Sequence, residues 1–168
     1  MQPKFNQKDI RLIIGLGNPD HHYENTYHNV GFLFVKYLES LPSNSPPSLK
    51  STVFMNESGS FVSRIVKKQG VAPQNLLIIH DDSDISLGDF KFSFGSGTAG
   101  HKGVASVASA LDTKDFWRLR IGIRSKPNFI KRSLGIRPKA GDFVLKKINT
   151  RDKKTLTEVF EKIISYFS

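Results

Sequence analysis

The sequence contains no cysteine, which excludes a disulfide framework, a thiol nucleophile and a zinc site with cysteine ligands. It has no apolar run near the roughly 20 residues that span a bilayer. Residues 1–9 also lack the apolar core of a signal peptide. Acidic residues are few, with 15 Asp and Glu against 25 Lys and Arg, which gives a formal net charge of +10. We therefore expect a soluble, cytoplasmic protein. We favour a nucleic-acid partner, because phosphate contacts dominate such affinities, over a merely lysine-rich composition.

The chain has 168 residues, a length typical of one domain with its own core. We expect a single domain over residues 1–168, with a flexible tail at 1–9 and a loop rich in proline and serine at 42–48. Hydrophobic periodicity predicts strands at 11–16, 52–55, 76–79, 89–94 and 116–123, and helices at 28–40, 57–69, 101–111 and 151–167. This order predicts an α/β fold class: one mixed, twisted sheet with helices on both faces.

Two of the predicted strands lead directly into polar residues. Residues 11–16 are followed by Asn18 and then His28, and residues 76–79 by Asp81. Ligands of parallel sheets bind off the carboxyl ends of the strands, so we expect a histidine and a carboxylate at one edge. The positive end of a helix beginning at His28 would disfavour a charged ring, and Asp81 would accept the second ring N–H, as a general base requires. The residues alone also allow a helix-capping histidine and an aspartate that merely ends a strand.

Two further motifs have weaker meanings. Residues 95–100 have the pattern G-x-G-x-x-G. No acidic residue ends the next strand, so we reject a dinucleotide-binding site. Two interpretations remain: a helix N-terminus that attracts an anion, or a plain glycine-rich turn. Residues 80–84, with His21, His22 or His101, offer ligands for a divalent metal, but without a recognised ligand spacing. We expect neither a metal nor a cofactor.

Amide and basic side chains supply candidate binding residues. Asn18, Asn29 and Asn56 suit the binding of a peptide group, and equally suit turns and caps; Asn56 is the expected cap of the helix at 57–69. Lys91, Arg118 and Arg120 lie on alternating strands, where they suit a phosphate clamp or an ordinary solvated sheet face.

Six segments, taken together and in order from Ile10 to about Leu145, resemble bacterial-type peptidyl-tRNA hydrolase. They are LIIGLGNP at 12–19, YENT at 23–26 with HNVG at 28–31, FMNESG at 54–59, HDDSD at 80–84 with Gly88, GHKG at 100–103, and RLRIGI at 118–123. The resemblance implies a monomeric α/β hydrolase that cleaves the ester between a peptide and the 3′ end of tRNA, without metal, and so recycles tRNA from stalled translation.

The resemblance also implies roles for individual residues. His28 would activate water and Asp81 would orient it. Substrate would be bound by Asn18, Tyr23, Asn56 and Lys102, and tRNA by Lys91 and Arg120.

The chain departs from the family pattern at three places. Lys102 stands where the family has asparagine; as a cation it can donate to an oxyanion but cannot accept a hydrogen bond. Tyr27 stands where arginine is usual and Asp20 where glycine is usual, and the segment 41–52 is shorter, which predicts a trimmed sheet edge. Two alternatives to the hydrolase stay open: an RNA-binding protein on the same scaffold with little or no activity, and a metal-dependent hydrolase.

Overall fold

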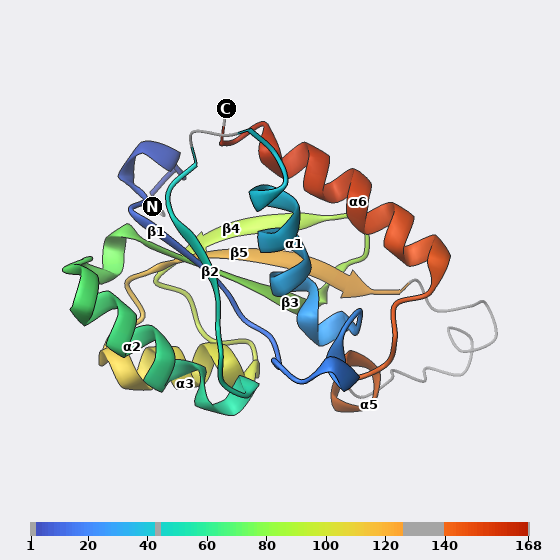
Figure 1. The fold of residues 1–168 in the computed structure, drawn as a ribbon, viewed down its shortest axis with the longest axis horizontal. Helices are drawn as coiled ribbons and strands as arrows, with labels where there is room; N and C mark the ends of the chain where they lie inside the picture. Colours follow the sequence, from blue (N-terminus) through green and yellow to red (C-terminus); the bar gives the residue numbers. More distant parts are fainter. Residues whose placement is uncertain (1–2, 43–44, 126–139, 168) are drawn as a thin grey trace.

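A computed structural model of the chain describes residues 3–42, 45–125 and 140–167. Its sheet contains β1 (Leu12–Gly15), β2 (Ser48–Lys50), β3 (Leu76–Ser86), β4 (Phe90–Phe94) and β5 (Trp117–Arg124). The strand order is β2-β1-β3-β5-β4 (Figure 1). All neighbouring pairs are parallel except β4 and β5, which are antiparallel. This mixed sheet confirms the predicted α/β class.

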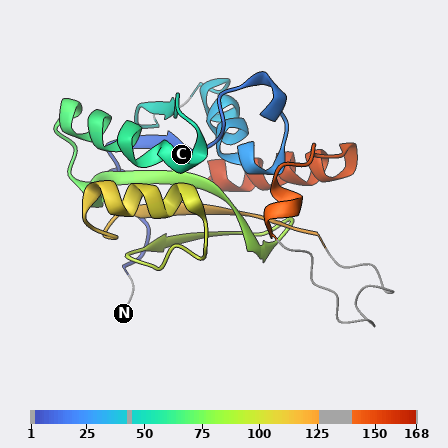
Figure 2. The ribbon, with the colours of Figure 1, turned by 90° about the horizontal axis from the view of Figure 1, so that it is seen from below.

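Helices cover both faces of the sheet, as the pattern predicts. α1 (Val30–Glu39) and α6 (Thr150–Ile164) lie on one face, and α2 (Ser58–Gln69) and α3 (Lys102–Leu111) lie side by side on the other (Figures 1 and 2). A short helix, α5 (Ala140–Val144), precedes α6. None of the helices in the described ranges combines the length and the hydropathy needed to cross a bilayer.

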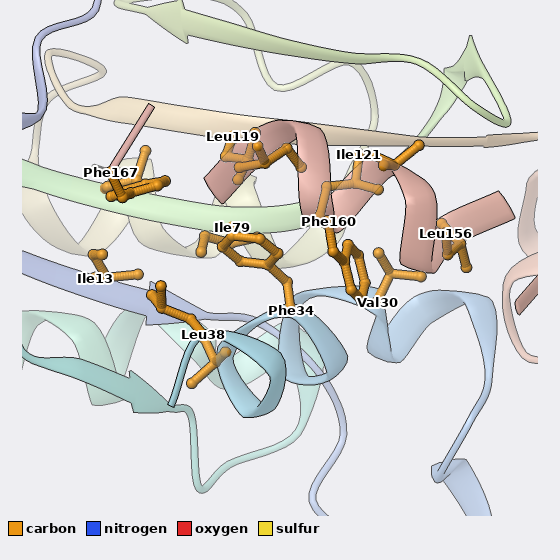
Figure 3. Packing of buried hydrophobic residues seen from close by; sticks show 14 of the residues in the cluster. Ile13, Val30, Phe34, Leu38, Ile79, Leu119, Ile121, Leu156, Phe160 and Phe167 are labelled. Atoms are coloured by element: carbon orange, nitrogen blue, oxygen red, sulfur yellow. The ribbon is translucent and has the colours of Figure 1, made fainter. Parts of the chain in front are cut away.

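The central strand β3 buries both of its faces, which explains its uninterrupted apolar run. Leu77 and Ile79 belong to the core cluster shared with α1 and α6, whereas Leu76 and Ile78 belong to the cluster shared with α2 and α3. In the first cluster, side chains of α1 and α6 meet those of the sheet (Figure 3). There the ring of Phe34 lies edge-on to that of Phe160, with 5.3 Å between centroids.

The segment between α1 and α2 differs from the prediction. The strand expected at 52–55 is absent from these described residues. β2 forms instead at Ser48–Lys50 and overlaps the predicted loop only at Ser48, after Pro47 accepts a hydrogen bond from the Ile13 N–H. The apolar side chains of Val53 and Met55 pack on the core cluster shared with α2 and α3, and they belong to no strand. Asn56 does not cap α2, because it lies within the short 3-10 helix Met55–Glu57 and the cap residue is Glu57. Residues 43–44 lie outside the described residues.

The end of β3 was also predicted wrongly. β3 does not end at residue 79 but continues to Ser86, because β5 pairs with it beyond that point, His80 opposite Arg120 and Asp81 opposite Ile121. Within the segment expected as a flexible tail, residues 3–9 are mostly exposed, and the ring of Phe5 stacks on Phe92 at 3.8 Å. Aromatic stacking on the edge strand β4 holds this segment in place.

Candidate active site

His28 is held close to the sheet by a contact that only glycine allows. It lies in the 3-10 turn Tyr27–Asn29, directly before α1. A Cβ atom on Gly31 would come within 2.5 Å of the Ile79 carbonyl oxygen, and one on Gly15 within 2.6 Å of the Gly31 carbonyl oxygen. Because both side chains are absent, the first turn of α1 packs directly on β1 and β3, and His28 lies beside β3.

Asp81 of β3 joins two histidines. Its Oδ1 atom lies 2.9 Å from Nδ1 of His28 and 2.9 Å from Nε2 of His101, the N-cap residue of α3. The two imidazole centroids are 5.0 Å apart. The structure therefore brings together the predicted pair His28 and Asp81. It adds His101, which the sequence indicates only as part of the GHKG motif and as a candidate metal ligand.

The hydrogen-bond partners fix the tautomer of each ring. Nδ1 of His101 accepts from the backbone N–H of Val104 at 3.2 Å, so the ring proton is on Nε2, which donates to Asp81. An ionised carboxylate only accepts, so Nδ1 of His28 is the donor of the second contact. When the ring is neutral, Nε2 of His28 carries a lone pair, and no group among the described residues donates a hydrogen bond to that nitrogen. That atom can take a proton from water.

Asp81 stays ionised although it is buried. Burial alone would raise the pKa of its carboxyl group, but the charges and hydrogen bonds of His101 and His28 outweigh it and hold the pKa well below its usual range. Beneath them, burial and the nearby His101 lower the pKa of His80 well below its ordinary value, so that ring is neutral and donates to the Asp81 carbonyl oxygen at 2.6 Å. Asp81 is thus the ionised carboxylate that faces the rings of His28 and His101.

Asn18 is fixed by a network that leaves its amide N–H groups for a ligand. Its Oδ1 atom accepts from the Met55 N–H at 2.8 Å, and its backbone N–H and C=O both bond to the side chain of Asn29, at 2.8 and 2.9 Å. Asn29 therefore acts as a scaffold residue rather than a substrate contact. With Oδ1 occupied, only the Nδ2 donor of Asn18 remains for an incoming oxygen atom.

A cleft of about 290 Å³ opens over the histidine pair, and Lys102, Val144 of α5 and the following Leu145 line it with His28. Lys102 is exposed. The three other predicted substrate residues lie outside this lining. Asn18 is buried, Asn56 is exposed, and half-buried Tyr23 meets the exposed ring of Phe54 edge-on at 6.4 Å.

The basic residues of the sheet are not equivalent. Nε of Arg120 donates to Oδ2 of Asp82 at 2.7 Å, so its charge is already paired, whereas Lys91 is exposed. Arg118 is buried and donates to the Gly97 carbonyl oxygen at 2.8 Å; burial, with help from Arg120, lowers its pKa to about 10. The glycine-rich loop covers Arg118, whereas Lys91 on the same face is exposed, so the face is solvated only in part. Arg118 anchors the loop instead of joining a phosphate clamp.

Tyr27, which stands where the resemblance leads us to expect arginine, is buried rather than at the site entrance. Its hydroxyl group donates to Oδ2 of Asp152 at 2.5 Å, and its ring stacks on Phe143 at 4.3 Å. Burial, together with Asp152, raises the pKa of Tyr27 well above its usual range. The contact ties the turn that bears His28 to α6.

Two groups of side chains in the described residues have the composition of a metal site: His28, Asp81 and His101, and Asp20, His21 and His22. In the first group, both ring nitrogens of His101 and Nδ1 of His28 already have protein partners. That arrangement fits a hydrogen-bonded acid–base system. The second group is exposed and lies on the loop after Asn18.

Comparison with known proteins identifies the family of the chain. The model of the family described as peptidyl-tRNA hydrolase matches residues 12–46 and 42–168. The chain belongs to the peptidyl-tRNA hydrolase family. A peptidyl-tRNA hydrolase of Mycolicibacterium gilvum is 34% identical over 90% of this chain and 85% of its own length, and one of Lawsonia intracellularis is 33% identical over 94% and 85%. The crystal structure of peptidyl-tRNA hydrolase from Acinetobacter baumannii superposes with a TM-score of 0.79 at 26% identity, covering 97% of this chain and 88% of that one.

Proposed function

We propose that His28 is the general base in the reaction of this peptidyl-tRNA hydrolase, the hydrolysis of the ester between a peptide and tRNA. The 2.9 Å contact between Nδ1 of His28 and Oδ1 of Asp81 carries the proposal, because it leaves the opposite ring nitrogen as a proton acceptor beside the cleft. A base in this position raises hydrolysis rates by about 10²–10⁴-fold.

The proton follows a closed cycle. Nε2 of His28 removes a proton from water as the water oxygen attacks the ester carbonyl carbon. The tetrahedral intermediate then collapses, the bond to the ribose oxygen breaks, and the His28 imidazolium returns the proton to that oxygen. Asp81 remains ionised throughout and stabilises the charged ring, as its low pKa allows.

The developing oxyanion needs a donor, and two candidates lie near the base. Nδ2 of Asn18 is the donor left over from a buried, fixed network, so it requires little reorganisation. Lys102 lines the cleft and supplies a cation. We assign Asn56 and Tyr23 to the surrounding substrate surface, where the peptide and the 3′-terminal ribose would lie.

The tRNA body is held by surface charge. The chain has a net charge of +10, and exposed Lys91 is available to a phosphate group, whereas Arg120 shares its charge with Asp82. We therefore assign Lys91 the larger contribution and Arg120 a smaller one. We further propose that the chain acts as a monomer in the cytoplasm, where its substrate arises, with no metal or cofactor taking part in the reaction and without a protein partner.

The test is release of N-acetyl-aminoacyl groups from tRNA, followed alongside tRNA binding. We expect the parent protein to turn over and His28→Ala to bind tRNA with nearly unchanged affinity but to release almost nothing. Turnover that persists in His28→Ala would refute the assignment of the base. A parent protein that binds tRNA and never turns over would instead establish the RNA-binding alternative, and a chelator that abolishes turnover would establish the metal-dependent one.

Lys102→Asn tests the departure from the family motif. Asparagine restores a side chain that both donates and accepts hydrogen bonds, so we expect the release rate to stay the same or rise. A large fall would show that the ammonium group of Lys102 has become essential in this chain.

A further inference from the structure

The loop after Asn18 presents a second histidine–carboxylate cluster that the proposed reaction does not use. Asp20 caps the short 3-10 helix His21–Tyr23, and its Oδ1 atom accepts from the His22 N–H at 2.9 Å. The same oxygen lies 2.7 Å from Nδ1 of His22 and 3.3 Å from Nδ1 of His21. Three potential ligand atoms from three consecutive residues therefore converge on one point.

We propose that Asp20, His21 and His22 bind a late first-row divalent metal ion of the Zn²⁺, Cu²⁺ or Ni²⁺ class. Imidazole nitrogen and carboxylate oxygen are the ligands that these ions prefer, whereas Ca²⁺ and Mg²⁺ favour oxygen ligands. The side chains are 78%, 75% and 43% exposed for His21, His22 and Asp20. A metal can thus enter directly from solvent, and water can complete its coordination.

The two oxygen–nitrogen separations are close to those that a metal requires. With bonds of about 2.0–2.1 Å, the ligand atoms of a tetrahedral site lie about 3.3 Å apart. The oxygen–nitrogen distances of 2.7 and 3.3 Å need only sub-ångström adjustment, and all three atoms lie within 4.8 Å of one another. The two rings have centroids 4.1 Å apart, so both lie on the same side of the turn.

The backbone of the turn is held in place before any metal binds. Nζ of Lys147 donates to the carbonyl oxygens of His22 and Glu24, at 2.7 and 2.6 Å. This contact fixes the turn and lowers the entropy lost when the ligands are ordered. Its positive charge also acts against a cation, so the site depends on the two imidazoles as well as on the single carboxylate. Metal binding leaves each ring neutral, with Nδ1 on the ion and the proton on Nε2.

The site is separate from the catalytic cluster in its residues and in its chemistry. Asp20 stands where the resemblance leads us to expect glycine, so this cluster is a feature of this chain. The loop also contains Asn18 and leads to Tyr23, so a bound ion would stiffen one rim of the active site without taking part in proton transfer.

The experiment is a Zn²⁺ titration of the full chain, free of any histidine tag and stripped with a chelator, by calorimetry and by competition with a chromogenic chelator. We expect one Zn²⁺ per chain, and the double variant His21→Gln/His22→Gln should bind at least about 10- to 100-fold more weakly, the loss typical of removing even an outer partner of a ligand. The control is His28→Gln/His101→Gln, which should bind as the parent does.

Paramagnetic Cu²⁺ provides a second readout that does not depend on activity. Substoichiometric Cu²⁺ should broaden the ring NMR signals of His21 and His22 before those of His28 and His101. The proposal is overturned if Zn²⁺ shows no saturable binding up to about 1 mM. It is equally overturned if the control variant, rather than the double variant at 21 and 22, loses the metal. Loss of hydrolysis in His28→Ala bears only on the catalytic assignment.

Discussion

The part of the chain that the structure describes contains two clusters of one aspartate and two histidines, and they differ in burial. In both clusters one carboxylate oxygen lies between two imidazoles, at 2.9 and 2.9 Å for Asp81 and at 2.7 and 3.3 Å for Asp20. The Asp81 side chain is 3% exposed and that of Asp20 is 43% exposed. An ion pair in water contributes little, whereas a buried, hydrogen-bonded carboxylate holds a neighbouring ring in one tautomer. The same three groups therefore suit a base in one place and an accessible ligand set in the other.

The largest effect is expected from removing the base itself. His28→Ala should lower the rate of release from N-acetyl-aminoacyl-tRNA by about 10³–10⁴-fold, because proton transfer from water is lost. Single-turnover kinetics measure this step. The matched change in the exposed cluster, His22→Ala, should leave the rate close to that of the parent in the presence of chelator. Similar losses in the two variants would remove the distinction between the clusters.

Replacing the carboxylates sharpens the comparison further. Asp81→Asn should lower kcat by about 10²–10³-fold, because an amide stabilises the His28 imidazolium less and can select the wrong tautomer. Asp20→Asn, which keeps a capping side chain, should change kcat by less than about twofold, as expected for an exposed pair. Circular dichroism checks that both variants fold. A steep loss in Asp20→Asn would contradict the account.

The free energy of unfolding should depend on pH more strongly through the buried groups His80 and Asp81 than through the exposed cluster. His80 has a folded pKa below its unfolded value of about 6.5, so the unfolded chain binds the proton more readily. Stability therefore falls by up to about 1.4 kcal/mol per pH unit as the pH drops below that value. Asp81 also has a depressed folded pKa. Its contribution is complete above about pH 3.9 and is lost as the pH falls further.

Urea unfolding at a series of pH values measures both slopes. We expect His80→Gln to flatten the dependence below about pH 6.5, and Asp81→Asn to flatten the more acidic limb more than Asp20→Asn does. Unchanged slopes in His80→Gln would show that this buried ring does not titrate on unfolding.

The smallest expected effect is on tRNA binding, where exposed Lys91 is compared with Arg120, whose charge is paired with Asp82. Lys91→Ala should lower the slope of log affinity for tRNA against log salt by about one unit, because one phosphate contact is removed. The double variant Asp82→Asn/Arg120→Gln removes a neutral pair and should change the slope less. Filter binding across a salt series measures both. A larger change in the double variant would restore Arg120 as the main phosphate contact.

The sequence predicts most of the fold, because periodicity reports which faces are buried. The strands at β1, β4 and β5 and the stripes of α1 and α6 follow from it. Along these two stripes, Phe32 of α1 and Ile164 near the end of α6 are nonetheless only partly buried. The strand expected at 52–55 failed because short apolar runs do not distinguish a strand from a loop that packs on a core.

The site was predictable in part. The pairing of His28 with Asp81 follows from the positions of their strands and helix, but the length of β3 did not, since its polar residues 80–86 are paired only through β5. The contact of His101 with Asp81 depends on how α3 begins, and the pairing of Arg120 with Asp82 depends on strand register. Such three-dimensional neighbours leave no periodic signal in the chain.

The tautomers of the two rings that bond to Asp81 provide the most direct test. In long-range ¹H–¹⁵N NMR spectra of the parent protein near neutral pH, the account predicts opposite neutral forms: a proton on Nδ1 in His28 and on Nε2 in His101. A proton on Nε2 of His28 would leave no lone pair facing the cleft, and would contradict the proposed base.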